Sequence, residues 1–206
     1  MTATRYDRPE YDGDSRPETQ KHIDQVNEFG KGFNRKLKMQ SVLHDMDSQA
    51  EPIDGLANEF SNKLGARLVT HDASKLVEPE CKFFDKGTPN LAKSTYGEES
   101  YDKAKDSIRE GIEHHYLMND HHPEHFGAAG VSGMNLYQLV EMYLDWRAAA
   151  LRHEDGNIFK SIHYNRGRFK LDPQLYDILL NTAIVDDPGM FGDAPDEVKE
   201  YLNGKV

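Results

Sequence analysis

Histidine and carboxylate side chains are concentrated in two short stretches of this chain. His71 and Asp72 are adjacent, and Asp145 lies further downstream. Five more histidines fall within twelve residues of one another: His114, His115, His121, His122 and His125. Neutral imidazole and carboxylate groups are ligands that divalent transition metals take in proteins. This pattern therefore indicates a metal-centred site.

Composition limits the classes of function open to the chain. Its 206 residues carry 36 acidic and 25 basic side chains, and the net charge is −11. Such a charge repels a polyanion, so we expect no extended nucleic-acid binding, although a local basic pocket can still hold a small phosphate. The single cysteine, Cys81, excludes an internal disulfide and a thiolate-rich zinc site.

A cytoplasmic, reducing setting is expected from the same data. The N-terminal sequence lacks the apolar region of a signal peptide, and no later stretch approaches the roughly 20 apolar residues of a membrane span. We therefore expect no membrane contact, and a homodimer remains open.

Apolar side chains recur every three or four residues along most of the chain, which predicts an all-α fold. No alternating pattern typical of strands competes with it. We expect a bundle of about five to seven helices. The predicted helices span residues 19–33, 56–69, 101–118, 135–153, 157–169 and 173–184.

The remaining segments are predicted to be irregular. Residues 1–18 form an N-terminal arm, residues 19–185 form one helical domain, and residues 186–206 form a loop-like tail that ends in a short turn. A loop with short helical turns is also expected over residues 76–101, because proline and glycine recur along it. These punctuating residues are Pro79, Gly87, Pro89 and Gly97.

Helical spacing places the reactive side chains. Helix 56–69 ends just before His71 and Asp72. On the next predicted helix His115 shares a face with apolar residues and should point inward, whereas His114 is turned aside by about 100°. A polar stripe along helix 135–153 is either a solvent face or one wall of a site, and it consists of Gln138, Glu141, Asp145 and Arg152.

The order of these residues resembles a known metal signature. His22, the His71-Asp72 pair and Asp145 lie on or near separate predicted helices, in the H...HD...D order of the HD-domain phosphohydrolase superfamily. A closer likeness, over most of residues 19–183, is to a family of HD-like proteins of bacteria and phages whose activity is not established. The matching stretches are HIDQV, HDASKLVEPE, TYGEESY, HHYLMNDHHPEHF, MNLYQLVEMYLDW and RHEDGNIFKSIHYNRGRF.

A further resemblance is to HD-GYP phosphodiesterases, which carry an HD pair followed by Gly-Lys and a downstream His-His pair. The corresponding residues here are HDASK at 71–75 and the pair His114-His115, with Ser74 in place of the glycine. The GYP tripeptide is absent from the chain, so specificity for cyclic dinucleotides is not implied.

The resemblance implies an HD-like helical bundle around two divalent ions, with Asp72 bridging them. The first set of ligands that it implies is His22, His71, Asp72 and Asp145. The second set is His115 with His114, His122 or His125. His44, followed by Asp45, is an alternative to His22. Manganese, iron, cobalt, nickel and zinc all suit such ligands, so the metal stays open.

The implied function is metal-dependent hydrolysis of a nucleotide or another small phosphate ester. A divalent ion lowers the pKa of bound water to about 7 and neutralises phosphoryl charge. Lys75 would contact a phosphate oxygen, and His125 would protonate the leaving oxygen. Asp72 and His115 complete the predicted catalytic set. If the protein is encoded by a phage, we expect it in the cytoplasm of the host cell.

Substrate contacts are expected from one predicted helix. Ser161, Asn165 and Arg168 lie at four- and three-residue steps, so they share a face that can form a polar wall. The resemblance adds Arg152 to this set.

Two other functions stay open: a mixed-valent di-iron oxygenase, as in some HD-domain relatives, and a non-catalytic module that binds metal or a nucleotide. Single residues also have structural alternatives. At least one of His121, His122 and His125 should be solvated. Glu80 is expected as a hydrogen-bond partner or loop anchor rather than as a ligand.

Overall fold

The computed structural model describes residues 23–24, 26–28, 52–91, 106–152 and 156–204. The predicted arm at 1–18, the ligand candidates His22 and His44, and most of the predicted helix at 19–33 lie outside these residues. The described parts of that helix, 23–24 and 26–28, are helical, and Ile23 and Val26 are buried as its periodicity predicts.

The described ranges form seven α-helices and three 3-10 helices, with no strand among them. This confirms the predicted all-α fold. In chain order the elements are α2 (Pro52–Val69), η2 (Ala73–Leu76), α3 (Glu80–Leu91), α5 (Arg109–Met118), η3 (Pro123–Gly133), α6 (Leu136–Arg152), α7 (Ile158–Phe169), α8 (Pro173–Asp186), η4 (Pro188–Asp193) and α9 (Asp196–Asn203).

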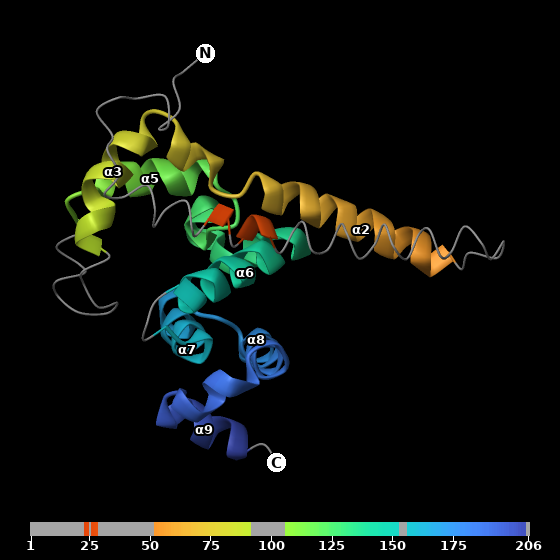
Figure 1. Ribbon diagram of the computed structural model, residues 1–206. Coiled ribbons are helices and arrows are strands. Elements are labelled where there is room, and N and C mark those ends of the chain that lie inside the picture. The colour runs from red at the N-terminus through yellow and green to blue at the C-terminus, as the bar shows by residue number, and fades with distance from the viewer. Residues whose placement is uncertain (1–22, 25, 29–51, 92–105, 153–155, 205–206) are drawn as a thin grey trace.

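Helix α6 lies at the centre of the structure, with α2, α5 and α7 around it (Figure 1). Its start is fixed by a reciprocal cap. The Asn135 side chain accepts hydrogen bonds from the backbone N–H groups of Tyr137 and Gln138, and the Gln138 side chain accepts one from the Asn135 N–H. The cap sets where α6 begins and therefore which of its side chains face the end of α2.

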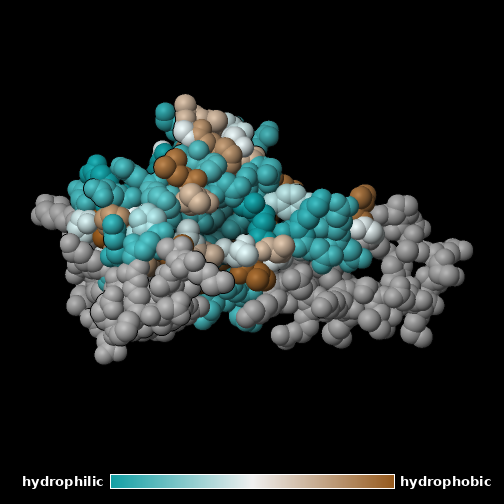
Figure 2. All heavy atoms as spheres, turned by 90° about the horizontal axis from the view of Figure 1, so that it is seen from above, coloured by the Kyte–Doolittle hydropathy of each residue, from teal (hydrophilic) through white to brown (hydrophobic). Residues whose placement is uncertain are grey.

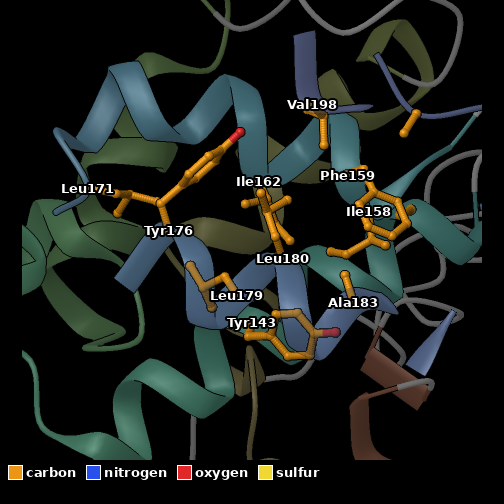
Figure 3. Close-up of a cluster of buried hydrophobic side chains, with 12 residues drawn as sticks. Tyr143, Ile158, Phe159, Ile162, Leu171, Tyr176, Leu179, Leu180, Ala183 and Val198 are labelled. Atoms are coloured by element: carbon orange, nitrogen blue, oxygen red, sulfur yellow. The ribbon is translucent and has the colours of Figure 1, made fainter. Parts of the chain in front are cut away.

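The main hydrophobic core lies where α7 and α8 pack against each other and against α6 (Figure 3). Its largest fully buried side chains are Phe159 and Tyr176. Both helices begin at side-chain caps, since Asn157 accepts from the N–H of Phe159 and Asp172 accepts from the N–H of Gln174. This core holds α6 from the side opposite α2.

A smaller core joins α2 to α6. Leu64 and Leu68 of α2 pack with Val26 and with Ala148 of α6. Phe60 stacks on Tyr137 with ring centroids 4.5 Å apart. These contacts fix the last turns of α2, so the residues that follow it are delivered to a defined place beside α6.

The segment predicted as a loop with short helical turns instead contains a twelve-residue helix, α3, at Glu80–Leu91. Gly87 and Pro89 lie within that helix. Gly87 lies against the residue that precedes α5: a Cβ on Gly87 would lie 2.3 Å from Cγ2 of Ile108. The glycine therefore permits close approach of two helical segments instead of breaking one.

The loop-like tail predicted from residue 186 also differs from the structure. Residues Pro188–Asp193 form η4, and Asp196–Asn203 form α9. Ala194 and Val198 belong to the main core. Tyr201 packs edge-on against Tyr176 at 5.3 Å and donates a hydrogen bond to Asp177. This segment is part of the folded domain.

The described surface agrees with the charge of the chain. Hydrophilic side chains predominate on the face shown in Figure 2, and hydrophobic ones form small separate groups there. None of the helices in the described ranges is long and apolar enough to span a bilayer.

Val198→Ala tests whether α9 is an integral part of the core. Val198 is fully buried, so the truncation leaves a cavity and should cost about 1–3 kcal/mol of unfolding free energy, measured by denaturant titration. Val185→Ala is the matched control, because Val185 is 79% exposed and its truncation should change stability by less than about 0.5 kcal/mol. Equal effects of the two changes would contradict the packing of α9.

Candidate metal centre

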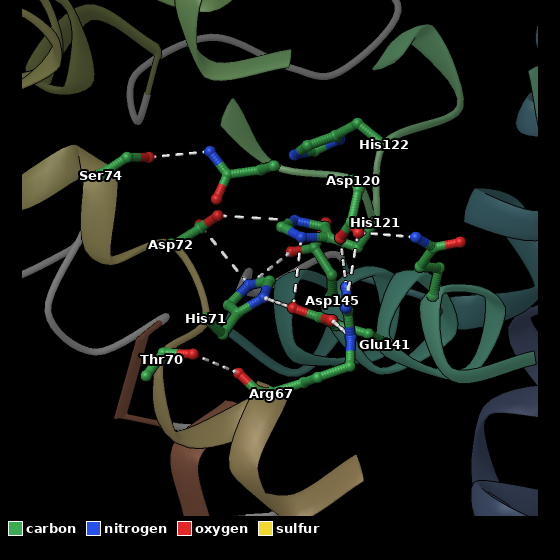
Figure 4. Close-up of polar contacts among 12 residues, drawn as sticks. Arg67, Thr70, His71, Asp72, Ser74, Asp120, His121, His122, Glu141 and Asp145 are labelled. Atoms are coloured by element: carbon green, nitrogen blue, oxygen red, sulfur yellow. Dashed lines mark hydrogen bonds and ion pairs between the residues drawn. The ribbon is translucent and has the colours of Figure 1, made fainter. Parts of the chain in front are cut away.

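His71 and Asp72 lie in the turn between α2 and η2, as their position after the predicted helix suggested. Both side chains are buried, and Asp72 is only 1% exposed. Asp72 has a left-handed backbone (φ 56°), a conformation that aspartate tolerates better than most residues. The turn places both side chains between α5 and α6 (Figure 4).

Three histidines approach Asp72 from the other side. His115 is on the buried face of α5, as predicted, and α5 ends at Met118. His121 and His122 follow in the turn before η3, where Pro123 is the first residue. Their rings are close together, with centroids 4.2 Å apart for His121 and His122 and 4.8 Å for His115 and His122.

The two carboxylate oxygens of Asp72 face different groups. Oδ1 lies 3.2 Å from His115 Nε2 and 3.5 Å from His121 Nε2. His122 Nε2 lies 3.0 Å from His115 Nε2. Oδ2 lies 3.5 Å from His71 Nε2, which is itself 3.7 Å from Asp145 Oδ1. Asp72 therefore stands between two sets of potential ligand atoms.

These separations suit divalent ions. With bonds of about 2.0–2.2 Å, ligand atoms around one ion lie about 3–3.6 Å apart at octahedral or tetrahedral angles. The four ligand atoms of Asp72, His115, His121 and His122 all lie within 4.8 Å of one another. His121 Nε2 is buried and has no hydrogen-bond partner in the described part of the chain. The donor set of imidazole and carboxylate thus fits a transition-metal site.

Carboxylates also face the Nδ1 atoms of these histidines. Glu141 Oε1 lies 3.1 Å from His71 Nδ1 and 3.3 Å from His121 Nδ1, and Glu80 Oε2 lies 2.9 Å from His115 Nδ1. An ionised carboxylate only accepts, so each Nδ1 carries a proton, and Nε2 is the ring atom that would face a metal.

A second grouping of His71, His121 and Glu141 also brings three ligand atoms within 4.8 Å. It is the less suitable cation site, because the histidine atoms that face Glu141 Oε1 are the protonated Nδ1 atoms, and Arg67 already pairs with Glu141 Oε2 at 2.7 Å. The Asp72 side is where the Nε2 atoms and the carboxylates converge.

The electrostatics of the site follow from its buried charges. Burial lowers the pKa of His71, but the carboxylates of Asp72, Asp145 and Glu141 outweigh burial and raise that pKa from 6.5 to about 10. Burial lowers the pKa of His122 well below its usual value, and His121 and His115 lower it further. His122 is therefore neutral at pH 7, which is the form that binds metal.

Two predicted site histidines lie outside this cluster. The side chain of His114 is 37% exposed and its Nδ1 pairs with Glu80 Oε1 at 2.8 Å. His125 is exposed, and its Nδ1 donates to the carbonyl of Tyr116 at 3.1 Å. His125 is thus the solvated member expected among the three histidines at 121, 122 and 125.

Lys75 contacts the cluster at Asp72, and Arg168 of α7 reaches it through Tyr116. Lys75 Nζ lies 2.5 Å from Asp72 Oδ2. Arg168 donates to the Tyr116 hydroxyl at 3.1 Å and pairs with Glu124, and the Tyr116 ring centroid lies 5.0 Å from that of His122. Asn165 is buried on α7, and Ser161 is partly buried there. Arg152 ends α6, and its side chain lies outside the described parts.

A comparison with known families matches the part of the chain that contains the site. The model of a family of unknown function, DUF5662, matches residues 12–184. The chain belongs to this family. No curated protein and no solved structure matches it. The match includes every ligand candidate named above, so the histidine and carboxylate cluster lies within the DUF5662 region of the chain.

Sequence reasoning left three important residues of this DUF5662 chain without a role in the site. The sequence pattern leaves Glu141 open as a solvent-facing residue, does not separate His121 from His122 and His125, and gives no role to Arg67. Position along the helices holds a signal for two of them. Glu141 lies four residues before Asp145 on α6, so the two share a face, and Arg67 lies in the last turn of α2, directly before the His71-Asp72 turn.

The raised pKa of His71 predicts how the chelator-treated protein responds to pH. A group whose pKa rises on folding adds stability that is complete below its unfolded pKa of about 6.5 and is lost as the pH rises toward about 10. The melting temperature of the metal-free protein should therefore fall between those pH values. In His71→Gln this fall should be smaller, and the same fall in both proteins would exclude His71 as its source.

Proposed function

We propose that this protein is a metal-dependent phosphohydrolase that uses two divalent ions and acts on a nucleotide or another small phosphate ester. The observation that carries the proposal is the placement of Asp72. One of its oxygens faces His71 on the side of Asp145, and the other faces His115 and His121. A carboxylate shared in this way is a natural bridge between two ions.

The HD-domain likeness supports the same assignment. His71, Asp72 and Asp145 are the three described members of the H...HD...D order, and the fold brings them together from the end of α2 and from α6. Their ligand atoms would hold one ion, with His22 as the expected fourth ligand. His115, His121 and His122 would hold the second ion with Asp72 Oδ1.

Bound ions of this kind supply an activated water and neutralise charge on a phosphoryl group. The residues of the chain have complementary tasks. Burial of Asp72, Glu141 and His115 keeps bulk water from the polar groups that orient the centre. Lys75 lies against Asp72 with its ammonium 5.2 Å from the Phe84 ring centroid, which supports the assignment of this cation to a phosphate oxygen of the substrate.

Arg168 is the basic residue of α7 that borders the site. Its contact with Tyr116, whose ring packs near His122, puts a guanidinium at the edge of the cluster. Glu124 neutralises it in this arrangement. We assign Arg168 to the substrate side of the proposed site.

The proposal also includes the reducing, cytoplasmic setting that the single cysteine leads us to expect.

The test is hydrolysis of a panel of nucleotides, phosphomonoesters and phosphodiesters by the protein loaded in turn with manganese, iron, cobalt, nickel and zinc. We expect at least one substrate to be cleaved. Asp72→Asn should lower kcat by about 100-fold or more, because it removes the charge shared by both ion positions. Asp106→Asn, at an exposed ion pair with Arg109, is the matched control and should leave kcat unchanged.

No cleavage of any substrate with any metal would overturn the proposal. Oxygen consumption that depends on reduced iron would instead support a di-iron oxygenase, which the same imidazole and carboxylate donors suit. Tight nucleotide binding with the nucleotide recovered intact would support a non-catalytic module.

Lys75→Met tests the phosphate-binding role. The change removes the ammonium but keeps much of the side-chain volume, and kcat/KM for the cleaved substrate should fall by about 10–100-fold. Lys63→Met removes a lysine from an exposed pair with Glu59 and should have no effect. Unchanged kcat/KM in Lys75→Met would remove this residue from the substrate site.

A further inference from the structure

One buried carboxylate contacts both halves of the centre. We infer that Glu141 is a positioning residue that couples the two ion positions, because it orients one ligand histidine of each. The inference rests on the two-ion centre of the proposed function.

The geometry at Glu141 Oε1 carries the inference. This oxygen lies 3.1 Å from Nδ1 of His71 and 3.3 Å from Nδ1 of His121. The two rings are neighbours, with centroids 4.4 Å apart. His71 turns its Nε2 toward Asp72 Oδ2, and His121 turns its Nε2 toward Asp72 Oδ1. One acceptor therefore fixes the tautomer and the ring orientation on both sides of Asp72.

Arg67 holds Glu141 in this position. Its Nε donates to Glu141 Oε2 at 2.7 Å, so the carboxylate is fixed at both oxygens. The same guanidinium pairs with Asp120, the residue before His121, and Gln138 Nε2 donates to Asp120 Oδ2 at 2.6 Å. The network joins the end of α2, the turn after α5 and helix α6 (Figure 4). Movement of either histidine would disturb the other through it.

Glu80 provides a contrast within the same site. Its Oε2 lies 2.9 Å from His115 Nδ1 and accepts from Ser74 Oγ at 2.9 Å, and its Oε1 faces His114 Nδ1. Of these, only His115 faces Asp72. Asn119 Nδ2 donates to Ser74 Oγ at 2.8 Å and so supports the Ser74 contact with Glu80. Glu80 is therefore expected to act on one ion position alone.

The experiment is a titration of the metal-free 206-residue chain with Co²⁺. Calorimetry measures the affinity of each ion, and the visible absorption of bound Co²⁺ reports the geometry of its ligands. Glu141→Gln is compared with Glu80→Gln after both are shown by circular dichroism to be folded. Wild type should bind two ions. Glu141→Gln should weaken both by about 10–100-fold and alter both spectra, because an amide can donate to Nδ1 and favour the wrong tautomer.

Glu80→Gln should weaken one ion and leave the other at wild-type affinity with an unchanged spectrum. If Glu141→Gln does not fold, Glu141→Asp is used in its place, with the same joint weakening expected. Two ions in wild type, with Glu141→Gln affecting only one or neither, would overturn the inference and leave the proposed function standing. No Co²⁺ binding by wild type would instead overturn the two-ion centre itself.

Discussion

The structure depends on how a fully buried carboxylate is stabilised. Asp72 is removed from water, and an isolated negative charge in that setting is strongly unfavourable. Burial raises its pKa, but His71, Lys75 and His115 outweigh burial and hold the pKa well below the usual value. Positive charge close to this side chain therefore stabilises it. The ammonium of Lys75 and the proton on His71 provide it here, and divalent ions would satisfy the same requirement.

The fold is arranged to meet this requirement. The α2 and α6 core delivers the His71-Asp72 turn, and α5 with the turn after it delivers three imidazoles. The main core around α7, α8 and α9 lies on the other side of α6 and contributes no ligand to either group. Stability thus comes mainly from one part of the described chain, and reactive groups gather in the other.

Much of this could be predicted from the sequence because helices have a strong period. The all-α class, the place of His71 and Asp72 after a helix, and the inward position of His115 follow from local spacing. The roles of His121 and Glu141 do not, since they depend on which face of α6 meets the end of α2. The same limit applies to α3: Gly87 and Pro89 suggest a loop locally, but Gly87 is needed where the helix packs closely against Ile108. Likewise, the burial of Val198 depends on the core formed by α7 and α8, which the local sequence around Val198 does not reveal.

Metal content tests the central claim most directly. Wild type and Asp72→Asn would be loaded separately with manganese, iron and zinc, dialysed and measured by elemental analysis, with folding checked by circular dichroism. The account predicts about two equivalents in wild type and loss of both in the folded variant, because Asp72 belongs to both ligand sets. Wild type that stays empty with all three metals would show that the histidines and carboxylates form a structural network, and would contradict the proposed centre.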